Sequence, residues 1–266
     1  MNRKKAGEIL NDKIGEAKKA ASAVAPAFDE TSIHAFRVAV KKLRAYMRLI
    51  ETDKEQPKVK LTKKFHTLYD IAGEIRDAQL KLKQAGAQGS KLKGYMESLQ
   101  YVVEAGKKNW HKRYKQKTIK ALTEKTGGAA LHKLPAKTLV LFVKKKIHVL
   151  EQAADSSPDD ELIHECRKSV KDMLYNTKLA EKQWPKAYEK IAHLPLKHLD
   201  HLADLLGNYN DERLLLASHI AFIPTAQSAV EKKELARLVD KEIELKAGQR
   251  HVLLKEIQNF ITAAAI

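Results

Sequence analysis

The stretch HAFRVAVK at residues 34–41 recurs as HECRKSVK at residues 164–171, with the histidine, arginine and lysine at the same spacing. A second stretch, LYDIAGEIRDAQL at residues 68–80, recurs as LADLLGNYNDERL at residues 202–214. Two motifs that return in the same order indicate an internal repeat. The chain is therefore predicted to consist of two related units.

Outside these motifs, apolar residues recur with the period of a helix almost throughout the chain. Charged residues make up 31% of the sequence and aromatic residues only 6%, and the abundant Ala, Leu and Lys lose little rotamer freedom in a helix. The expected helices cover about residues 3–22, 32–51, 58–83, 91–123, 136–154, 159–184, 196–222 and 226–263. We therefore predict an all-α fold of two four-helix bundle units, residues 1–128 and 129–266, packed about a pseudo-twofold axis.

Basic residues are concentrated in the first unit. The chain has 50 Lys and Arg against 33 Asp and Glu, a formal net charge of +17. Residues 1–130 hold 29 basic and 14 acidic residues, a net charge of +15, whereas residues 131–266 hold 21 and 19, a net charge of +2. This excess is either a solvated, lysine-rich surface or a permanent electrostatic site for a polyanion, whose binding would relieve the self-repulsion.

Polar residues of the repeated segments have the spacing of a single helix face. At 3.6 residues per turn they form one stripe, and the apolar residues between them occupy a different face that suits the core. The stripe of the first unit contains His34, Arg37, Lys41, Arg44 and Arg48, and that of the second contains His164, Arg167, Lys168, Lys171, Tyr175 and Lys178. A row of cations matches a linear polyanion, because Arg offers forked donors to phosphate oxygens and Lys offers a point charge.

On these motifs the chain resembles the CHAD family, the conserved histidine α-helical domain, from about residue 5 to residue 262. The resemblance implies two four-helix bundles about a basic central groove or pore, and binding of inorganic polyphosphate by the two stripes. It also implies association with polyphosphate granules. The sequence departs from the repeat where Leu174 stands opposite Arg44 and Asn210 opposite Arg76. We therefore expect the second unit to bind the polymer less strongly.

The repeated histidines and aspartates have roles that the sequence alone leaves open. His34 and His164 are either core histidines satisfied by a neighbour or donors to phosphate, in which case a bound polyanion raises their pKa. For Asp77 and Asp211 we predict a structural role, in which a carboxylate one helix away orients a basic side chain of the stripe.

The repeated glycines are costly in helix interiors, by roughly 1 kcal/mol each relative to alanine. Close packing between the second and third helices of each unit would explain Gly73 and Gly207. Along the fourth helices we predict additional cationic walls for the polymer, formed by Lys108, Lys112, Arg113 and Arg250.

Two further patterns suggest catalytic or metal sites but do not fit them. Glu242-Ile-Glu244-Leu-Lys246 has the spacing of a triphosphate-tunnel enzyme signature. That chemistry needs the three side chains on one face, whereas alternate residues of a helix diverge by roughly 200°. His198 and His201 share a helix face, but surface or satisfied histidines explain them better than metal ligands. Because no phosphate-binding glycine loop, nucleophile elbow or catalytic pair accompanies them, we expect no enzymatic activity, no cofactor and no metal.

The sequence thus predicts a cytoplasmic, granule-associated module that recruits or organises polyphosphate without hydrolysing it. The lone Cys166 fits a reducing cytoplasm, and the apolar run at residues 139–143 is too short to cross a membrane, so we expect no membrane partner. One alternative is a nucleic-acid-binding helical protein, because a net charge of +17 suits any phosphate backbone. Another is an enzyme on phosphate polymers or an accessory module for one. Chain-length preference and oligomeric state stay open.

Overall fold

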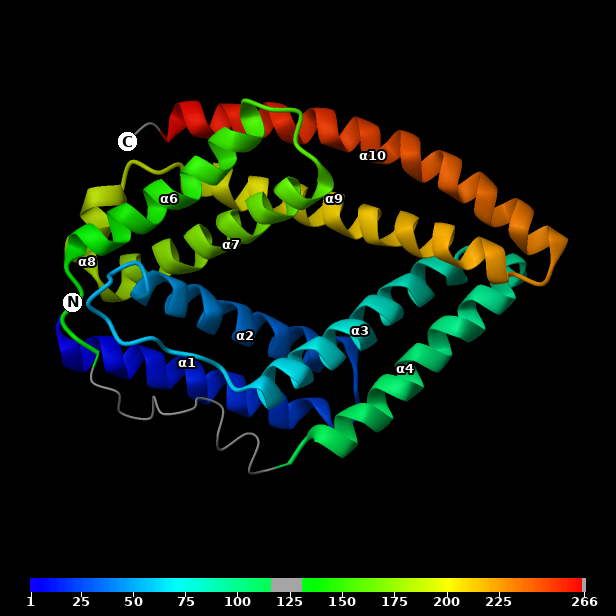
Figure 1. Cartoon of the computed structure of the whole chain (residues 1–266), viewed down its shortest axis with the longest axis horizontal. Helices are drawn as coiled ribbons and strands as arrows, with labels where there is room; N and C mark the ends of the chain where they lie inside the picture. Colours follow the sequence, from blue (N-terminus) through cyan, green and yellow to red (C-terminus); the bar gives the residue numbers. More distant parts are fainter. Residues whose placement is uncertain (116–130, 265–266) are drawn as a thin grey trace.

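The computed structural model describes residues 1–115 and 131–264, which form α-helices joined by short connections (Figure 1). The α-helices are α1 (Arg3–Val24), α2 (Glu30–Ile50), α3 (Lys63–Gly86), α4 (Lys93–Arg113), α6 (Ala136–Ala154), α7 (Asp160–Gln183), α8 (Pro185–Tyr188), α9 (Leu196–Phe222) and α10 (Ala229–Ala263). Three 3-10 turns are η1 (Gly89–Leu92), η2 (Glu189–Ile191) and η3 (Ile223–Thr225). No β-strand occurs in this part of the chain, so the all-α prediction is confirmed.

The two histidine-bearing helices begin in the same way. The side chain of Asp29 accepts a hydrogen bond from the Ser32 N–H at 2.8 Å, and Asp159 accepts one from the Leu162 N–H at 2.8 Å. Each aspartate therefore satisfies a backbone donor that has no partner within the helix. These two caps fix the residue at which α2 and α7 each begin. The starting residue in turn determines which face of each helix points toward its neighbours.

Two helix boundaries differ from the prediction by five residues or more. α3 begins at Lys63 rather than near residue 58, because Thr62 caps it by accepting the Phe65 N–H at 3.3 Å. α4 ends at Arg113 rather than near residue 123, because Tyr114 is extended, with its ring stacked 5.8 Å from Trp110. The remainder of that predicted helix reaches into residues 116–130, which lie outside the described residues.

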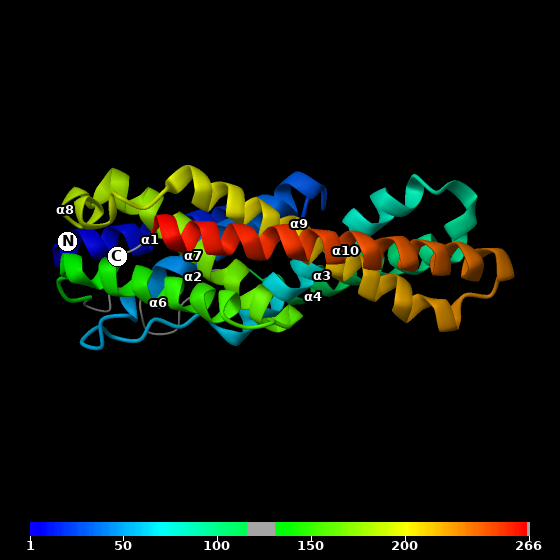
Figure 2. The same ribbon diagram turned by 90° about the horizontal axis from the view of Figure 1, so that it is seen from above.

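α2 and α7 pack against each other along the middle of the molecule, and the other helices are arranged around this pair. α1 packs on α2 and α6 on α7, while α3 pairs with α4 and α9 with α10 to form two long helical hairpins. Turned by 90°, the molecule is an elongated, comparatively thin body (Figure 2). The two stripe-bearing helices are therefore in contact, whereas the equivalence of the two units stays a prediction.

The two hairpins also meet at their far ends, beyond the α2–α7 contact. The Tyr95 N–H at the start of α4 donates to Glu231 of α10 at 2.9 Å, and the Tyr95 hydroxyl lies 2.8 Å from the Ser218 hydroxyl of α9. The first and second halves of the chain thus meet both at the α2–α7 pair and at the ends of the hairpins, and α2, α3, α7 and α9 lie around the region between these contacts (Figure 1).

Candidate anion-binding site

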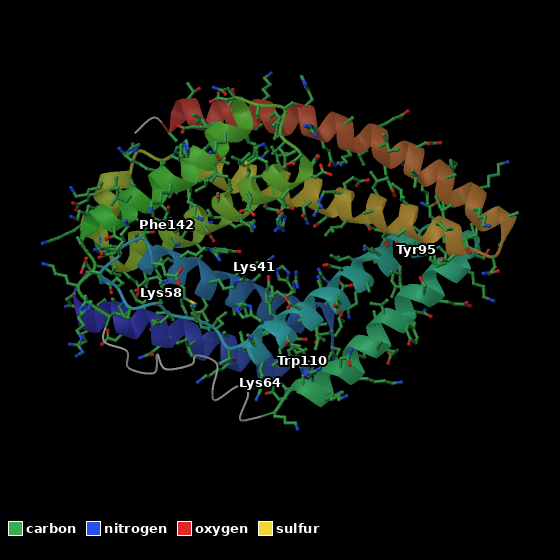
Figure 3. The ribbon with its side chains drawn as sticks, in the orientation of Figure 1. Lys41, Lys58, Lys64, Tyr95, Trp110 and Phe142 are labelled. Atoms are coloured by element: carbon green, nitrogen blue, oxygen red, sulfur yellow. The ribbon has the colours of Figure 1, made fainter. Side chains whose placement is uncertain are left out.

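α2 carries a row of cations along one face and apolar residues along the other. Phe36, Val40 and Leu43 are fully buried in the core. Arg37 and Lys41, one turn apart, are only half-buried, because they lie on the face of α2 that the apolar residues do not occupy. Lys41 lies between α2 and α7, near the middle of the molecule (Figure 3).

The facing helix α7 brings more positive charge to Lys41. Burial, and then the positive charges of Arg167, Arg37 and Lys171, lower the pKa of Lys41 from its usual value of 10.5 to about 8, while Asp211 acts in the opposite direction. Burial is also the main reason why the pKa of Lys171 is lowered. The two stripes therefore converge around Lys41.

Four cations at this convergence have no anionic partner. They form what we call the cation cluster, and they are Arg37, Lys41, Arg44 and Arg167. Within residues 1–115 and 131–264 none of the four makes an ion pair or a hydrogen bond, and the Nε atom of Arg167 is buried without a hydrogen-bond partner. Half-buried cations without partners are energetically costly, which is the arrangement expected of a site that waits for an anion.

Tyr69 and Gly73 of α3 hold the arginines of α2 in place. The guanidinium carbon of Arg37 lies 5.0 Å from the centre of the Tyr69 ring, and that of Arg44 lies 5.5 Å from it. Both distances are within the range of cation–π attraction. A Cβ atom at Gly73 would collide with the Arg37 guanidinium, so this glycine makes room for the arginine. Close packing between the second and third helices thus explains Gly73.

The same explanation is wrong for Gly207. An added Cβ atom there would meet nothing within 4 Å. Arg167 has the position of Arg37 in the second copy of the motif. It therefore does not pack against Gly207 of α9 as Arg37 packs against Gly73 of α3. The repeat preserves the residue type at this position but not the contact that requires it in the first unit.

This difference supplies a matched pair of substitutions. We expect Gly73→Ala to displace Arg37 and to weaken anion binding about fivefold, or ~1 kcal/mol. Gly207→Ala should leave binding unchanged and stabilise the helix by about 0.5–1 kcal/mol. Titration with polyphosphate and chemical denaturation of both variants measure these effects. Wild-type affinity in Gly73→Ala would show that the position of Arg37 is unimportant.

The two stripe histidines lie in different surroundings. Desolvation, and then the positive charges of Arg76, Lys41 and Arg37, lower the pKa of the exposed His34. Burial comes first among the causes that lower the pKa of His164, whose Nδ1 lies 3.3 Å from the Asn210 side-chain oxygen. Both rings are therefore neutral at pH 7, and His34 is the one that lacks a protein partner among the described residues.

Several cations of the predicted stripes already have carboxylate partners. Arg48 makes a bidentate ion pair with the buried Asp172 of α7, at 2.6 Å and 2.5 Å. Lys171 lies 3.9 Å from Asp204, close to the limit for an ion pair. Two more are exposed and paired, Lys178 with Asp200 at 2.7 Å and Lys168 with Glu165. These residues have less positive charge to offer a ligand than the cation cluster has.

The cationic walls predicted from the fourth helices are not brought to the cluster. Lys108, Lys112 and Arg113 are exposed on α4, and the nearby Trp110 packs at 5.4 Å against Phe36, on the apolar face of α2. Arg250 of α10 donates to the backbone carbonyl of Pro158, next to the start of α7. The structure thus gives Arg250 a helix-anchoring contact and leaves the α4 cations at the surface.

The repeated aspartates lie near the cluster but do not bind its side chains. Burial is the largest influence on Asp77 and raises its pKa, while Arg37 and Lys81 oppose the shift. Asp211 is exposed, and its carboxylate accepts a hydrogen bond from the neighbouring Asn210 amide at 3.3 Å. Neither carboxylate is within ion-pair distance of a cation in the described chain, so both act on the cluster through their electric field.

Two residues that the sequence analysis did not single out are central here. Tyr69 supports two arginines, but the equivalent position of the second unit is Ala203. Comparison of the two copies of the motif therefore gives no sign that Tyr69 has a role. Asp172 lies on the core side of α7 and is 3% exposed. A carboxylate among the apolar residues of an amphipathic helix is an unusual feature, and that signal could have pointed to it.

The rejected sequence patterns have other partners in the structure. Glu242 is buried against His219 at 2.9 Å, and Lys246 reaches Asp160 at 2.6 Å, so they point to different neighbours. In the described residues no three His, Cys, Asp or Glu side chains are grouped as metal ligands would be. No helix of that part of the chain is both long and apolar enough to cross a membrane.

The fold and the cluster together define an all-α domain whose central helix pair presents unpaired cations. A family model described as the CHAD domain matches residues 8–218, and the chain therefore belongs to the CHAD domain family. It is similar to the crystal structure of the CHAD domain from the plant Ricinus communis, with 17% identity and a TM-score of 0.64. That match covers 100% of this chain and 94% of the other, and it shows the fold alone. A search of curated proteins finds no match.

Proposed function

We propose that this protein binds inorganic polyphosphate through the cation cluster, without hydrolysing it, and that it recruits the polymer to cytoplasmic granules or organises it there. The observation that carries the proposal is the set of four cations from α2 and α7 that have no anionic partner among the described residues. A bound polyanion would compensate these charges and relieve their mutual repulsion.

A polymer suits this geometry better than a compact anion. Successive cations of α2 lie one turn apart, about 5.4 Å along the helix axis, so the cluster is a row rather than a cup. Arginine presents paired donors to neighbouring oxygens of a phosphate, which makes Arg37, Arg44 and Arg167 suitable contacts for successive phosphate groups. Membership of the CHAD family supports the same ligand class.

The cluster is less suited to nucleic acid, because the aromatic ring that two of its arginines contact is already covered by them. Proteins that hold single strands stack bases on aromatic side chains. Tyr69 has the guanidinium groups of Arg37 and Arg44 over its ring, and Trp110 is fully buried. A ligand that consists of phosphate alone can use the arginines without needing these rings.

The proposal predicts binding that depends on chain length and on salt. Affinity should rise at least about tenfold from triphosphate to long-chain polyphosphate, since only long chains reach both α2 and α7. It should fall steeply with added salt, because a polymer that contacts several cations releases counterions. Titration by calorimetry at a series of salt concentrations measures both effects.

Single- and double-stranded nucleic acids at matched phosphate concentration and ionic strength serve as competitors in the same titration. Equal affinity for triphosphate and long chains would indicate a compact anion site instead of a polymer site. Displacement of polyphosphate by nucleic acid at equal phosphate concentration would favour the nucleic-acid alternative.

A further inference from the structure

Lys41 differs from three other half-buried lysines of the described chain, Lys146, Lys171 and Lys246. Lys146, Lys171 and Lys246 each have a carboxylate within 4 Å, at 2.9 Å, 3.9 Å and 2.6 Å. Lys41 is half-buried between α2 and α7 and has no carboxylate at that distance in residues 1–115 and 131–264. Its amine therefore carries a charge that the surroundings oppose rather than stabilise.

The groups that face Lys41 come from four helices. Arg37 lies one turn before it on α2, and α7 contributes Arg167 and Lys171. Two opposing charges act on it from a distance, the carboxylates of Asp77 on α3 and Asp211 on α9. An amine thus lies beside two guanidinium groups that can hold a phosphate group.

We propose that Lys41 is a modification site that reacts with small acyl phosphates. The inference rests on the proposed function in one respect, namely that the same arginines bind phosphate groups. Arg37 and Arg167 hold the phosphate part of the reagent and place its carbonyl carbon next to the Lys41 Nζ atom. This combination of a phosphate-binding pair and an amine matches a reagent that contains both a phosphate and an acyl group.

The reaction is a simple acyl transfer. The lone pair of the neutral amine attacks the carbonyl carbon, an amide bond forms, and the bond from that carbon to the phosphate oxygen breaks. Inorganic phosphate leaves with the bonding electrons, and the proton lost from the nitrogen passes to the phosphate or to water. Only the neutral amine reacts. With a pKa of about 8, about a tenth of Lys41 is neutral at pH 7, against about three in ten thousand for an ordinary lysine.

Acylation would remove the central positive charge of the cluster. The product is a neutral amide, which can no longer pair with phosphate, so the modified protein should bind polyphosphate more weakly. In the opposite direction, bound polyphosphate would occupy Arg37 and Arg167 and protect Lys41 from the reagent. Modification and polymer binding would therefore each weaken the other.

Acetyl phosphate is the probe for the test, and quantitative peptide mass spectrometry of the whole protein measures the rate at each lysine. We expect Lys41 to react at least about tenfold faster than the exposed Lys232 and Lys233 of α10. The rate at Lys41 should level off above pH 8, whereas that of exposed lysines should keep rising toward pH 10. Arg167→Gln should reduce the advantage of Lys41 with acetyl phosphate. The same variant should slow the reaction with acetyl N-hydroxysuccinimide ester less, because that reagent lacks the phosphate and the loss of Arg167 then acts only by raising the pKa of Lys41.

The outcomes separate this inference from the proposed function. Equal rates at Lys41 and the exposed lysines would overturn the inference, and so would an equal effect of Arg167→Gln on both reagents. Fast reaction of Lys41 that long-chain polyphosphate does not slow would support the modification site and contradict polymer binding at the cluster. Polyphosphate binding with no preference for Lys41 would leave the proposed function intact and remove the inference.

Discussion

Replacement of Arg37 and Lys41 together by glutamate is expected to weaken polyphosphate binding by at least about 100-fold, or ~3 kcal/mol. Each substitution removes a cation and introduces an anion in a half-buried position, where electrostatic interactions are stronger than at the surface. Neither residue takes part in an ion pair within the described chain, so no ion pair is lost, and the structural contact removed is that of Arg37 with the Tyr69 ring. Titration with long-chain polyphosphate measures the effect, and circular dichroism checks that the helical content is unchanged.

Two further double variants give this result its meaning. Lys232→Glu with Lys233→Glu makes the same change in net charge on the exposed surface of α10, and it should weaken binding only about twofold through the distant, screened field. Arg167→Glu with Lys171→Glu should have an intermediate effect, because Lys171 already lies 3.9 Å from Asp204. Equal losses in all three variants would mean that diffuse net charge is sufficient and that the cluster has no special role.

The arrangement of the cation cluster could be predicted from sequence because it depends on local geometry. The spacing of Arg37, Lys41 and Arg44 places them on one face of a helix whatever the rest of the chain does. Recurrence of the motif around Arg167 predicts a second helix with its cations on one face in the same way. What brings the two faces together is the packing of α2 on α7, which includes the Arg48–Asp172 ion pair and a hydrogen bond from Asn176 to the Ala45 carbonyl.

The partners of the individual cations could not be predicted, because they come from distant parts of the sequence. Arg48 follows the spacing of the stripe, yet Asp172 lies 124 residues away and takes up its charge. Gly207 has the same place in its motif as Gly73, but only the first unit has an arginine packed against the glycine. Helical periodicity determines which way a side chain points, whereas the ion pair that it makes depends on tertiary packing.

The stripe of α2 therefore has two parts with different roles. Arg37, Lys41 and Arg44 have no anionic partner among the described residues and are available to a ligand. Arg48, one turn further, joins α2 to α7 through Asp172, and Lys146 of α6 contacts the same carboxylate at 2.9 Å. A single helix face thus supplies both the proposed binding site and the contact that holds its two helices together.

Asp172→Ala is expected to destabilise the protein by about 3 kcal/mol, because removal of one partner of a buried ion pair leaves the others uncompensated. The Asp172 side chain is 4% exposed and serves two cations, Arg48 and Lys146, from two different helices. Arg48 is 38% exposed and can regain some hydration, which keeps the expected loss at the lower end of the range for such pairs. Chemical denaturation followed by circular dichroism measures the change in the free energy of unfolding.

Asp204→Ala is the matched control, since it also removes a carboxylate that faces a stripe cation. Asp204 is 79% exposed and lies 3.9 Å from Lys171, so its loss should cost no more than about 0.5 kcal/mol. Asp172→Ala should bind polyphosphate at least as tightly as the wild type below its unfolding transition, because it frees Arg48 beside the cluster. If the two variants were equally stable, the carboxylate of Asp172 would not be what joins α2, α6 and α7. Their contact would then depend on apolar packing alone.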